Sequence, residues 1–233
     1  MVLATVWGGW RAILYLRVQS ELSRIRAEGY PATAVELEAW YAYPKGPNAA
    51  DIYLKAFDAL VKDEELEKKL PGIGVYVQWP TSGESVPADM VAAIHRYLEL
   101  NKQSLQLLHE AATIPECRYP LDFTQGADGK LTHVGGYRRA TRLLDLEASW
   151  AIRRGDAEQF VASLQTLGAL ARSIRNEPLP LSYEISVGAR LSAVETLEPG
   201  FPSWTLANEH RWPPAHSLPS APPPPQQRLL FIF

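Results

Sequence analysis

The sequence predicts an all-α fold, either an irregular helical bundle or a short array of helical hairpins, with one long internal loop. Apolar residues recur every three or four positions through most of Thr33–Leu197, which is the spacing of helices that bury one face. Alternation of the β type is confined to residues 72–80, which is too little for a sheet. With 233 residues, 46% of them hydrophobic, the chain can bury a sizeable core.

Composition divides the chain into three regions. Residues 1–30 read as an N-terminal helix, either amphipathic or a truncated anchor, and residues 31–198 read as the helical domain. Residues 199–233 are rich in proline, which breaks helices, so we expect a disordered tail. This tail is interpreted as a docking peptide for a proline-binding module or as the product of a shifted reading frame or truncation.

The N-terminal segment has two interpretations. It is apolar but shorter than the roughly 20 residues that a spanning helix needs, and Arg11 and Arg17 interrupt it. It is either an amphipathic helix with exposed Trp7 and Trp10 or the end of an anchor whose start is missing. Contact with a membrane would then involve Trp7, Trp10, Arg11 and Arg17. An anchor implies a membrane-associated or extracytoplasmic bacterial protein, and its absence implies a cytoplasmic one.

Helix-start signals divide the middle of the chain into six or seven helices. Thr33 with Glu36 forms a capping box, and Asn48 can cap the next helix, which continues through the charged stretch Lys62–Lys69. A long helix is expected over Ala88–Ala112. Asn101 interrupts its apolar stripe, and we expect this residue to be hydrogen-bonded in the core.

Two antiparallel helices are expected next, over Val134–Arg154 and Asp156–Asn176, because Gly155 and Asp156 leave room for only a short turn. A last helix is expected from Ser182 to Leu197. The hairpin resembles a tetratricopeptide-type helical pair over residues 143–175, through the spacing of Ala148, Gly155-Asp156 and the apolar position four residues later. Phe160 is bulkier than the repeat's small residue, and no 34-residue period recurs.

Three further segments resemble uncharacterised bacterial proteins that carry an N-terminal membrane anchor and a helical extracytoplasmic domain. They are Arg24–Thr33 (RIRAEGYPAT), Leu37–Tyr41 (LEAWY) and Cys117–Gln125 (CRYPLDFTQ). The resemblance implies a helical domain behind an anchor and carries no activity with it.

The sequence lacks the features that indicate several common kinds of binding or catalytic site. The net charge of −3 gives no basic face for nucleic acid, so no nucleic-acid partner is expected. A single cysteine excludes an internal disulfide and a thiolate cluster. No metal, phosphate-loop or nucleophile-elbow motif is present, and we predict no cofactor and no metal. His95 and His109 are interpreted as surface or boundary residues.

The loop Pro115–Gly136 holds the candidate binding residues, because long loops inside compact domains are often functional. They are Cys117, Arg118, Tyr119, Asp122 and His133. A structural interpretation has Arg118 paired with an acid, and Tyr119 and Phe123 packed against the helices.

We predict a non-catalytic helical interaction or scaffold domain that binds a protein partner. In the anchor interpretation, the N-terminal segment also tethers it to a membrane. No catalytic residue is assigned. One alternative is a hydrolase-like enzyme that uses the 115–136 loop, with Cys117 as nucleophile and His133 as base. The other is a gene fragment without independent function.

Overall fold

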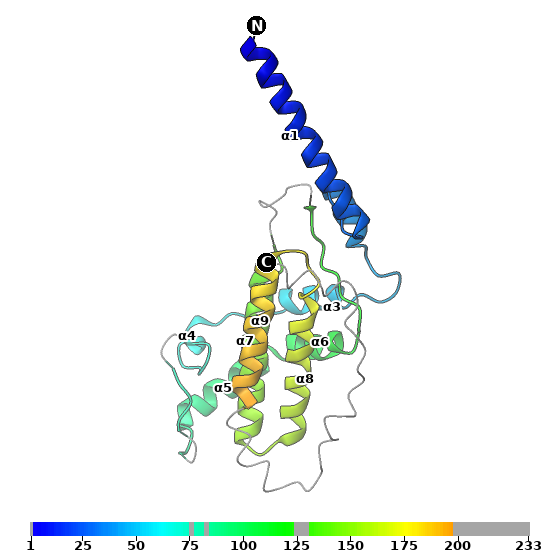
Figure 1. Ribbon diagram of the computed structural model, residues 1–233. Coiled ribbons are helices and arrows are strands. Elements are labelled where there is room, and N and C mark those ends of the chain that lie inside the picture. Colours follow the sequence, from blue (N-terminus) through cyan, green and yellow to red (C-terminus); the bar gives the residue numbers. More distant parts are fainter. Residues whose placement is uncertain (1, 75–76, 82–83, 124–130, 198–233) are drawn as a thin grey trace, which may run out of the picture. The chain divides into compact units, whose positions relative to one another are not determined.

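The computed structural model describes residues 2–74, 77–81, 84–123 and 131–197, which form nine helices and no strand (Figure 1). The all-α prediction is therefore confirmed. The helices are α1 (Val2–Ala27), α2 (Ala34–Trp40), α3 (Ala49–Asp58), α4 (Glu64–Glu67), α5 (Ala88–Leu100), α6 (Lys102–Ala112), α7 (Val134–Arg153), α8 (Ala157–Ser173) and α9 (Pro180–Leu197). The chain divides into residues 1–198 and 199–233, and the predicted tail lies outside the described residues.

The core forms around the hairpin of α7 and α8, against which α3, α6 and α9 pack (Figure 1). The largest side chains that are fully buried come from these helices and from the segments between them. They are Tyr53, Leu70, Ile94, Leu108, Tyr119, Tyr137, Leu143, Leu144, Leu146, Leu167, Leu170 and Ile174. Apolar stripes on several helices thus meet in one interior, as the helical spacing of the sequence predicts.

Local capping signals set the starts of several helices. The Thr33 hydroxyl accepts the backbone N–H of Glu36 at the start of α2, and the Glu36 carboxylate accepts the backbone N–H of Ala32. The Asp156 carboxylate accepts the N–H of Gln159 at the start of α8. Gly155 adopts φ +77° between α7 and α8, a conformation that favours glycine at a helix end. The predicted hairpin is therefore present.

Asn48 caps α3 and also holds the start of the long loop. Its Oδ1 accepts the backbone N–H groups of Ala50 and, at 2.9 Å, of Arg118. Its Nδ2 donates to the carbonyl oxygen of Arg118, also at 2.9 Å. One side chain therefore joins two segments that are 70 residues apart in the sequence.

Two expected helices are shorter than the sequence analysis predicts. The helix capped by Asn48 ends at Asp58, and the charged stretch Lys62–Lys69 forms the separate short helix α4, which Asp63 caps. The predicted continuation is wrong because Asp63 accepts the N–H of Leu66 and starts a new helix. The expected helix Ala88–Ala112 is divided into α5 and α6 at Asn101.

Asn101 is fully buried and hydrogen-bonded, as predicted from its interruption of an apolar stripe. Its Nδ2 donates to the Tyr97 carbonyl oxygen, and its Oδ1 accepts the N–H of Val61 at 2.9 Å. The second bond satisfies a backbone donor in the connection between α3 and α4. The break between α5 and α6 is thus fixed by a side chain that serves a distant segment.

Candidate functional site

The structure brings three of the five candidate residues of the 115–136 loop together inside the protein. Cys117, Tyr119 and His133 are all buried. The rings of Tyr119 and His133 stack with centroids 4.4 Å apart and planes 7° apart. Arg118 is half-buried and Asp122 is exposed. The loop candidates therefore divide into a buried group and two residues nearer the surface.

Among the residues that the structure describes, Arg118 is given no ion pair with an acid. Its guanidinium lies 5.5 Å from the ring centroid of Tyr41 and donates to the Cys117 carbonyl oxygen. Phe123 packs edge-on against the same tyrosine, with centroids 5.6 Å apart. Tyr119 is buried against the Tyr53 and Phe57 rings of α3, as expected. Phe123 is buried too, and its ring contact is with Tyr41, the residue after α2.

His133 faces a carboxylate that the sequence analysis did not identify. Its Nε2 lies 2.9 Å from Oε1 of Glu177, and both side chains are buried. The two atoms are close enough for an ion pair, although they are not aligned for a hydrogen bond. The Ser182 hydroxyl donates to Oε2 of Glu177. This group ties the end of the loop to the connection between α8 and α9, and 44 residues separate His133 from Glu177, so no local pattern signals it.

The buried group does not offer the chemistry of a cysteine nucleophile. Burial raises the pKa of the Cys117 thiol to about 12, with the Glu177 carboxylate adding to the shift. The thiol therefore stays protonated near neutral pH, whereas a nucleophile needs the thiolate. The Tyr119 hydroxyl is 3.1 Å from Oγ of Ser173, which itself donates to the Leu170 carbonyl oxygen. These contacts describe a packed polar core.

A second polar cluster surrounds His109 on α6. Its Nδ1 lies 2.7 Å from the Thr166 hydroxyl, and its Nε2 lies 3.1 Å from Oε2 of Glu147. The Ser163 hydroxyl is 2.7 Å from the same carboxylate oxygen. This order of carboxylate, imidazole and hydroxyl occurs in catalytic triads. Here, however, Thr166 is buried and its hydroxyl donates to the Ala162 carbonyl oxygen of its own helix. The contacts of His109 with Thr166 and Glu147 join α6 to α8 and α7.

His109 also lines two surface grooves, which have volumes of about 360 and 560 Å³. The first lies between it and the exposed His95, whose ring packs edge-on against Trp150 at 5.4 Å. The placement of His109 at the boundary of the core agrees with its predicted role. Its partners Glu147 and Thr166 were missed because they lie 38 and 57 residues away along the chain.

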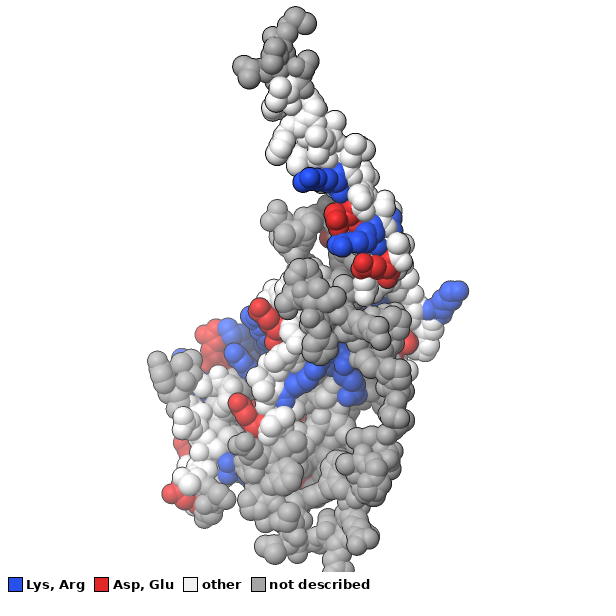
Figure 2. All heavy atoms as spheres, in the orientation of Figure 1, with Lys and Arg blue, Asp and Glu red and all other residues white. Residues whose placement is uncertain are grey.

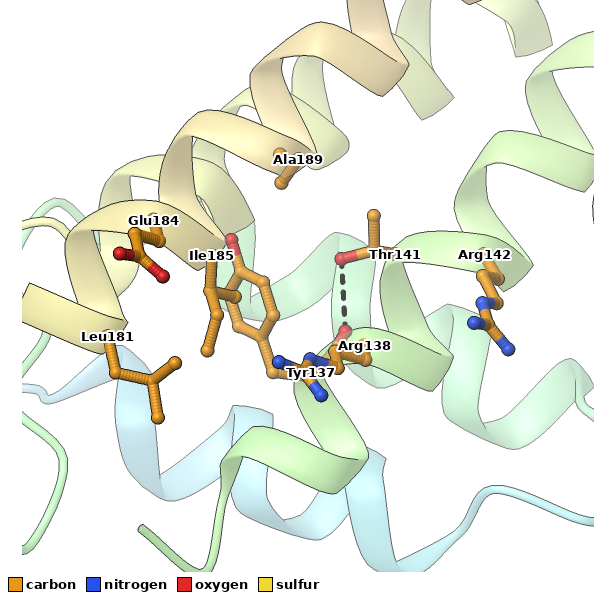
Figure 3. A pocket seen from close by; sticks show the side chains of 9 residues that line it. Tyr137, Arg138, Thr141, Arg142, Leu181, Glu184, Ile185 and Ala189 are labelled. Atoms are coloured by element: carbon orange, nitrogen blue, oxygen red, sulfur yellow. Dashed lines mark hydrogen bonds between the residues drawn. The ribbon is translucent and has the colours of Figure 1, made fainter.

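A third groove, of about 330 Å³, lies between α7 and α9 (Figure 3). Arg138 and Arg142 line it from α7, and Leu181, Glu184 and Ile185 line it from α9. The Tyr137 ring lies against Ile185 with its hydroxyl directed towards α9 (Figure 3). None of the five loop candidates lines this groove or the two beside His109.

The helix α1 carries large apolar side chains that are more than two-fifths exposed. They are Val6, Trp7, Trp10, Ile13, Leu14, Tyr15, Leu16 and Val18. Arg11 and Arg17 lie among these apolar residues, and Glu21, Arg24 and Arg26 follow them. Figure 2 shows charged side chains of this helix in blue and red. Among the described residues, no helix is both long enough and apolar enough to span a membrane.

Within the described part of the chain, no three histidine, cysteine, aspartate or glutamate side chains are placed to hold a metal ion. Comparison with known proteins adds no assignment. No protein-family model, no curated protein and no solved structure matches this chain.

Proposed function

We propose that the chain is a non-catalytic helical interaction domain that α1 attaches to an anionic membrane surface. The observation that carries the proposal is the row of exposed apolar side chains on α1, which includes Trp7 and Trp10 at 62% and 63% exposure. Clusters of exposed apolar side chains of this kind mark surfaces that bind another molecule or a membrane.

The residue types on α1 favour a lipid surface as its binding partner. Tryptophan is enriched where the hydrocarbon of a bilayer meets water, and arginine is attracted to anionic headgroups by about 1 kcal/mol per residue. Arg11 lies 5.0 Å from the ring centroid of Trp7, so the two side chains can enter the headgroup region together. Burial of each large apolar side chain adds about 1.5–3 kcal/mol.

The helical body supports the interaction part of the proposal. Tyr183, Leu191 and Val194 on α9 are between 41% and 57% exposed and recur at helical spacing on one side of that helix. A helix that lays its apolar face into a groove of a protein partner uses such a row of apolar anchors. The hairpin of α7 and α8 belongs to the same proposal as a tetratricopeptide-like scaffold.

The membrane part is tested by sedimentation with vesicles of phosphatidylcholine alone and of phosphatidylcholine mixed with phosphatidylglycerol. The protein is expected to bind the mixed vesicles. The double variant Trp10→Glu/Leu14→Glu should bind at least tenfold more weakly, because it places two carboxylates on the apolar part of α1. The control is Val35→Glu, which changes a side chain of α2 that is 74% exposed and should leave binding unaltered. Equal binding by the double variant and the unmodified protein would contradict the proposal.

The protein partner is tested by affinity capture with the Leu191→Asp/Val194→Asp variant. A partner retained by the unmodified chain and by the Val161→Asp control, but lost with the α9 variant, supports an interaction surface on α9. Val161 is a suitable control because it is an exposed apolar residue on α8. A partner set that is identical for all three chains would count against the α9 surface.

A further inference from the structure

The groove between α7 and α9 combines an apolar wall with two arginines and one glutamate. Leu181, Ile185 and Ala189 recur every four residues along α9 and line the groove over about 12 Å of the helix. Leu181 remains 43% exposed, and Ile185 packs partly against the core. This wall can cover a short alkyl chain and remove it from water.

Two arginines stand beside this wall one helical turn apart. Arg138 and Arg142 occupy positions i and i+4 of α7, which places their Cβ atoms about 6 Å apart. Both are exposed, and neither forms an ion pair with any residue that the structure describes. Their guanidinium groups are thus available to bind one anionic group, as arginine forks bind carboxylates.

Tyr137 lies beneath the groove. The residue is 1% exposed, and its hydroxyl makes no hydrogen bond within the described residues. Burial raises the pKa of Tyr137, so the hydroxyl keeps its proton and remains a donor at neutral pH. The hydroxyl is closed off from solvent, so Tyr137 contributes its ring to the floor of the groove and not a hydrogen bond to a ligand.

The small residue Gly188 keeps the groove open. A Cβ atom built on it would meet no atom within 4 Å, so the space beside this position is empty. A larger side chain at position 188 would occupy that space without straining the helix, since glycine is not required there by a positive φ.

From these observations we propose that the groove between α7 and α9 binds a small amphiphilic anion, a short alkyl chain that carries one carboxylate. The alkyl chain lies along Leu181, Ile185 and Ala189, and the carboxylate binds Arg138 and Arg142 at the rim. Glu184 also lines the groove and opposes an anion, so it weakens the site.

The test is a calorimetric titration of the full chain with octanoate, with octanol as the uncharged comparator. Octanoate is expected to bind at one site per chain and octanol to bind at least tenfold more weakly. Arg138→Gln/Arg142→Gln should weaken octanoate binding about tenfold and leave octanol binding unchanged, whereas Glu184→Gln should tighten octanoate binding. Arg96→Gln on α5 is the charge control, because Arg96 is exposed and lies outside the groove.

A second pair of variants tests the location independently of charge. Gly188→Leu should abolish octanoate binding by filling the groove, whereas Gly135→Leu should not, although a Cβ at Gly135 also meets nothing within 4 Å. Circular dichroism verifies that both variants fold. Octanoate that binds no more tightly than octanol, or that binds Gly188→Leu like the unmodified chain, would overturn the proposal. The Trp10→Glu/Leu14→Glu variant should bind octanoate normally, so the groove and the membrane surface are tested separately.

Discussion

The Nε2 atom of His133 lies 2.9 Å from Oε1 of Glu177, and both side chains are inaccessible to solvent. A buried pair of this kind is costly to break, because removal of one partner leaves the other without compensation in a medium of low polarity. Its position at the end of the long loop ties that loop to the connection between α8 and α9, beside the contact of Tyr119 with Ser173 on α8.

We therefore predict that His133→Gln and Glu177→Gln each lower the free energy of unfolding by about 3–5 kcal/mol. The double variant should cost less than the sum of the two, because neither partner is then left alone. Urea unfolding measures all three. The matched control is Arg154→Gln, which breaks an ion pair with Asp156 whose side chains are 44% and 40% exposed, and should cost less than about 1 kcal/mol. Strictly additive losses would show that the pair does not interact.

Asn101→Ala should lower the free energy of unfolding by about 1–3 kcal/mol, because it leaves the backbone N–H of Val61 without an acceptor. Chemical denaturation measures the change. Asn176→Ala provides the comparison, since Asn176 is exposed and its replacement should cost less than about 0.5 kcal/mol. Equal losses of unfolding free energy at the two positions would show that the hydrogen bond between Asn101 and Val61 does not stabilise the fold.

Two adjacent glycines at the start of α7 should respond in opposite ways to alanine. A Cβ on Gly136 would lie 2.5 Å from Cβ of Phe57, whereas one on Gly135 would meet nothing within 4 Å. Gly136→Ala should therefore cost about 1–3 kcal/mol through the collision with α3. Gly135→Ala should be neutral or stabilising, because alanine favours a helix more than glycine does. Thermal unfolding of the two variants, compared side by side, measures the difference.

Cys117 should react slowly in the folded protein and follow a displaced pH profile. Burial raises the pKa of its thiol to about 12, so the thiolate fraction in the native state continues to rise well above pH 9. In urea the alkylation rate should level off once the pH passes the ordinary cysteine pKa of about 8.5. Because the chain has one cysteine, the iodoacetamide reaction monitors this thiol alone. A native rate that levels off near pH 9 would contradict the assigned burial.

The raised pKa of Cys117 also predicts how the free energy of unfolding changes with pH. The folded state holds the Cys117 proton more tightly than the unfolded state, so the unfolded state loses it first as the pH rises above about 8.5. The free energy of unfolding should decrease from there towards pH 12. Cys117→Ala should make this decrease shallower, and pH-dependent urea unfolding compares the two chains.

The parts of the fold that the sequence predicted are those fixed by neighbouring residues. Thr33, Asn48 and Asp156 act through bonds to amides two or three positions away, and the Gly155 turn depends on one residue. The division at Asn101 was not predicted, because it depends on a bond to Val61, 40 residues earlier.

The candidate site was predicted less completely for the same reason. The sequence pointed to Cys117, Tyr119 and His133, which the fold does bring into one buried group. Their partners Ser173 and Glu177 belong to later segments, and only tertiary packing places them there. A similar long-range contact joins Asp145 on α7 to the Thr196 hydroxyl on α9, and no spacing rule connects those two positions.

The two hydrogen bonds between Asn48 and Arg118 restrict which residues can replace asparagine at position 48. Serine, aspartate and asparagine are nearly equivalent at the start of most helices, because each supplies an oxygen. Only asparagine also offers two N–H groups, and here one of them is committed to the loop backbone. A change to aspartate, which would be silent in an ordinary helix, would leave α3 capped but remove the donor that the Arg118 carbonyl oxygen uses. In this protein the residue that caps α3 therefore also holds a segment seventy residues later in the chain.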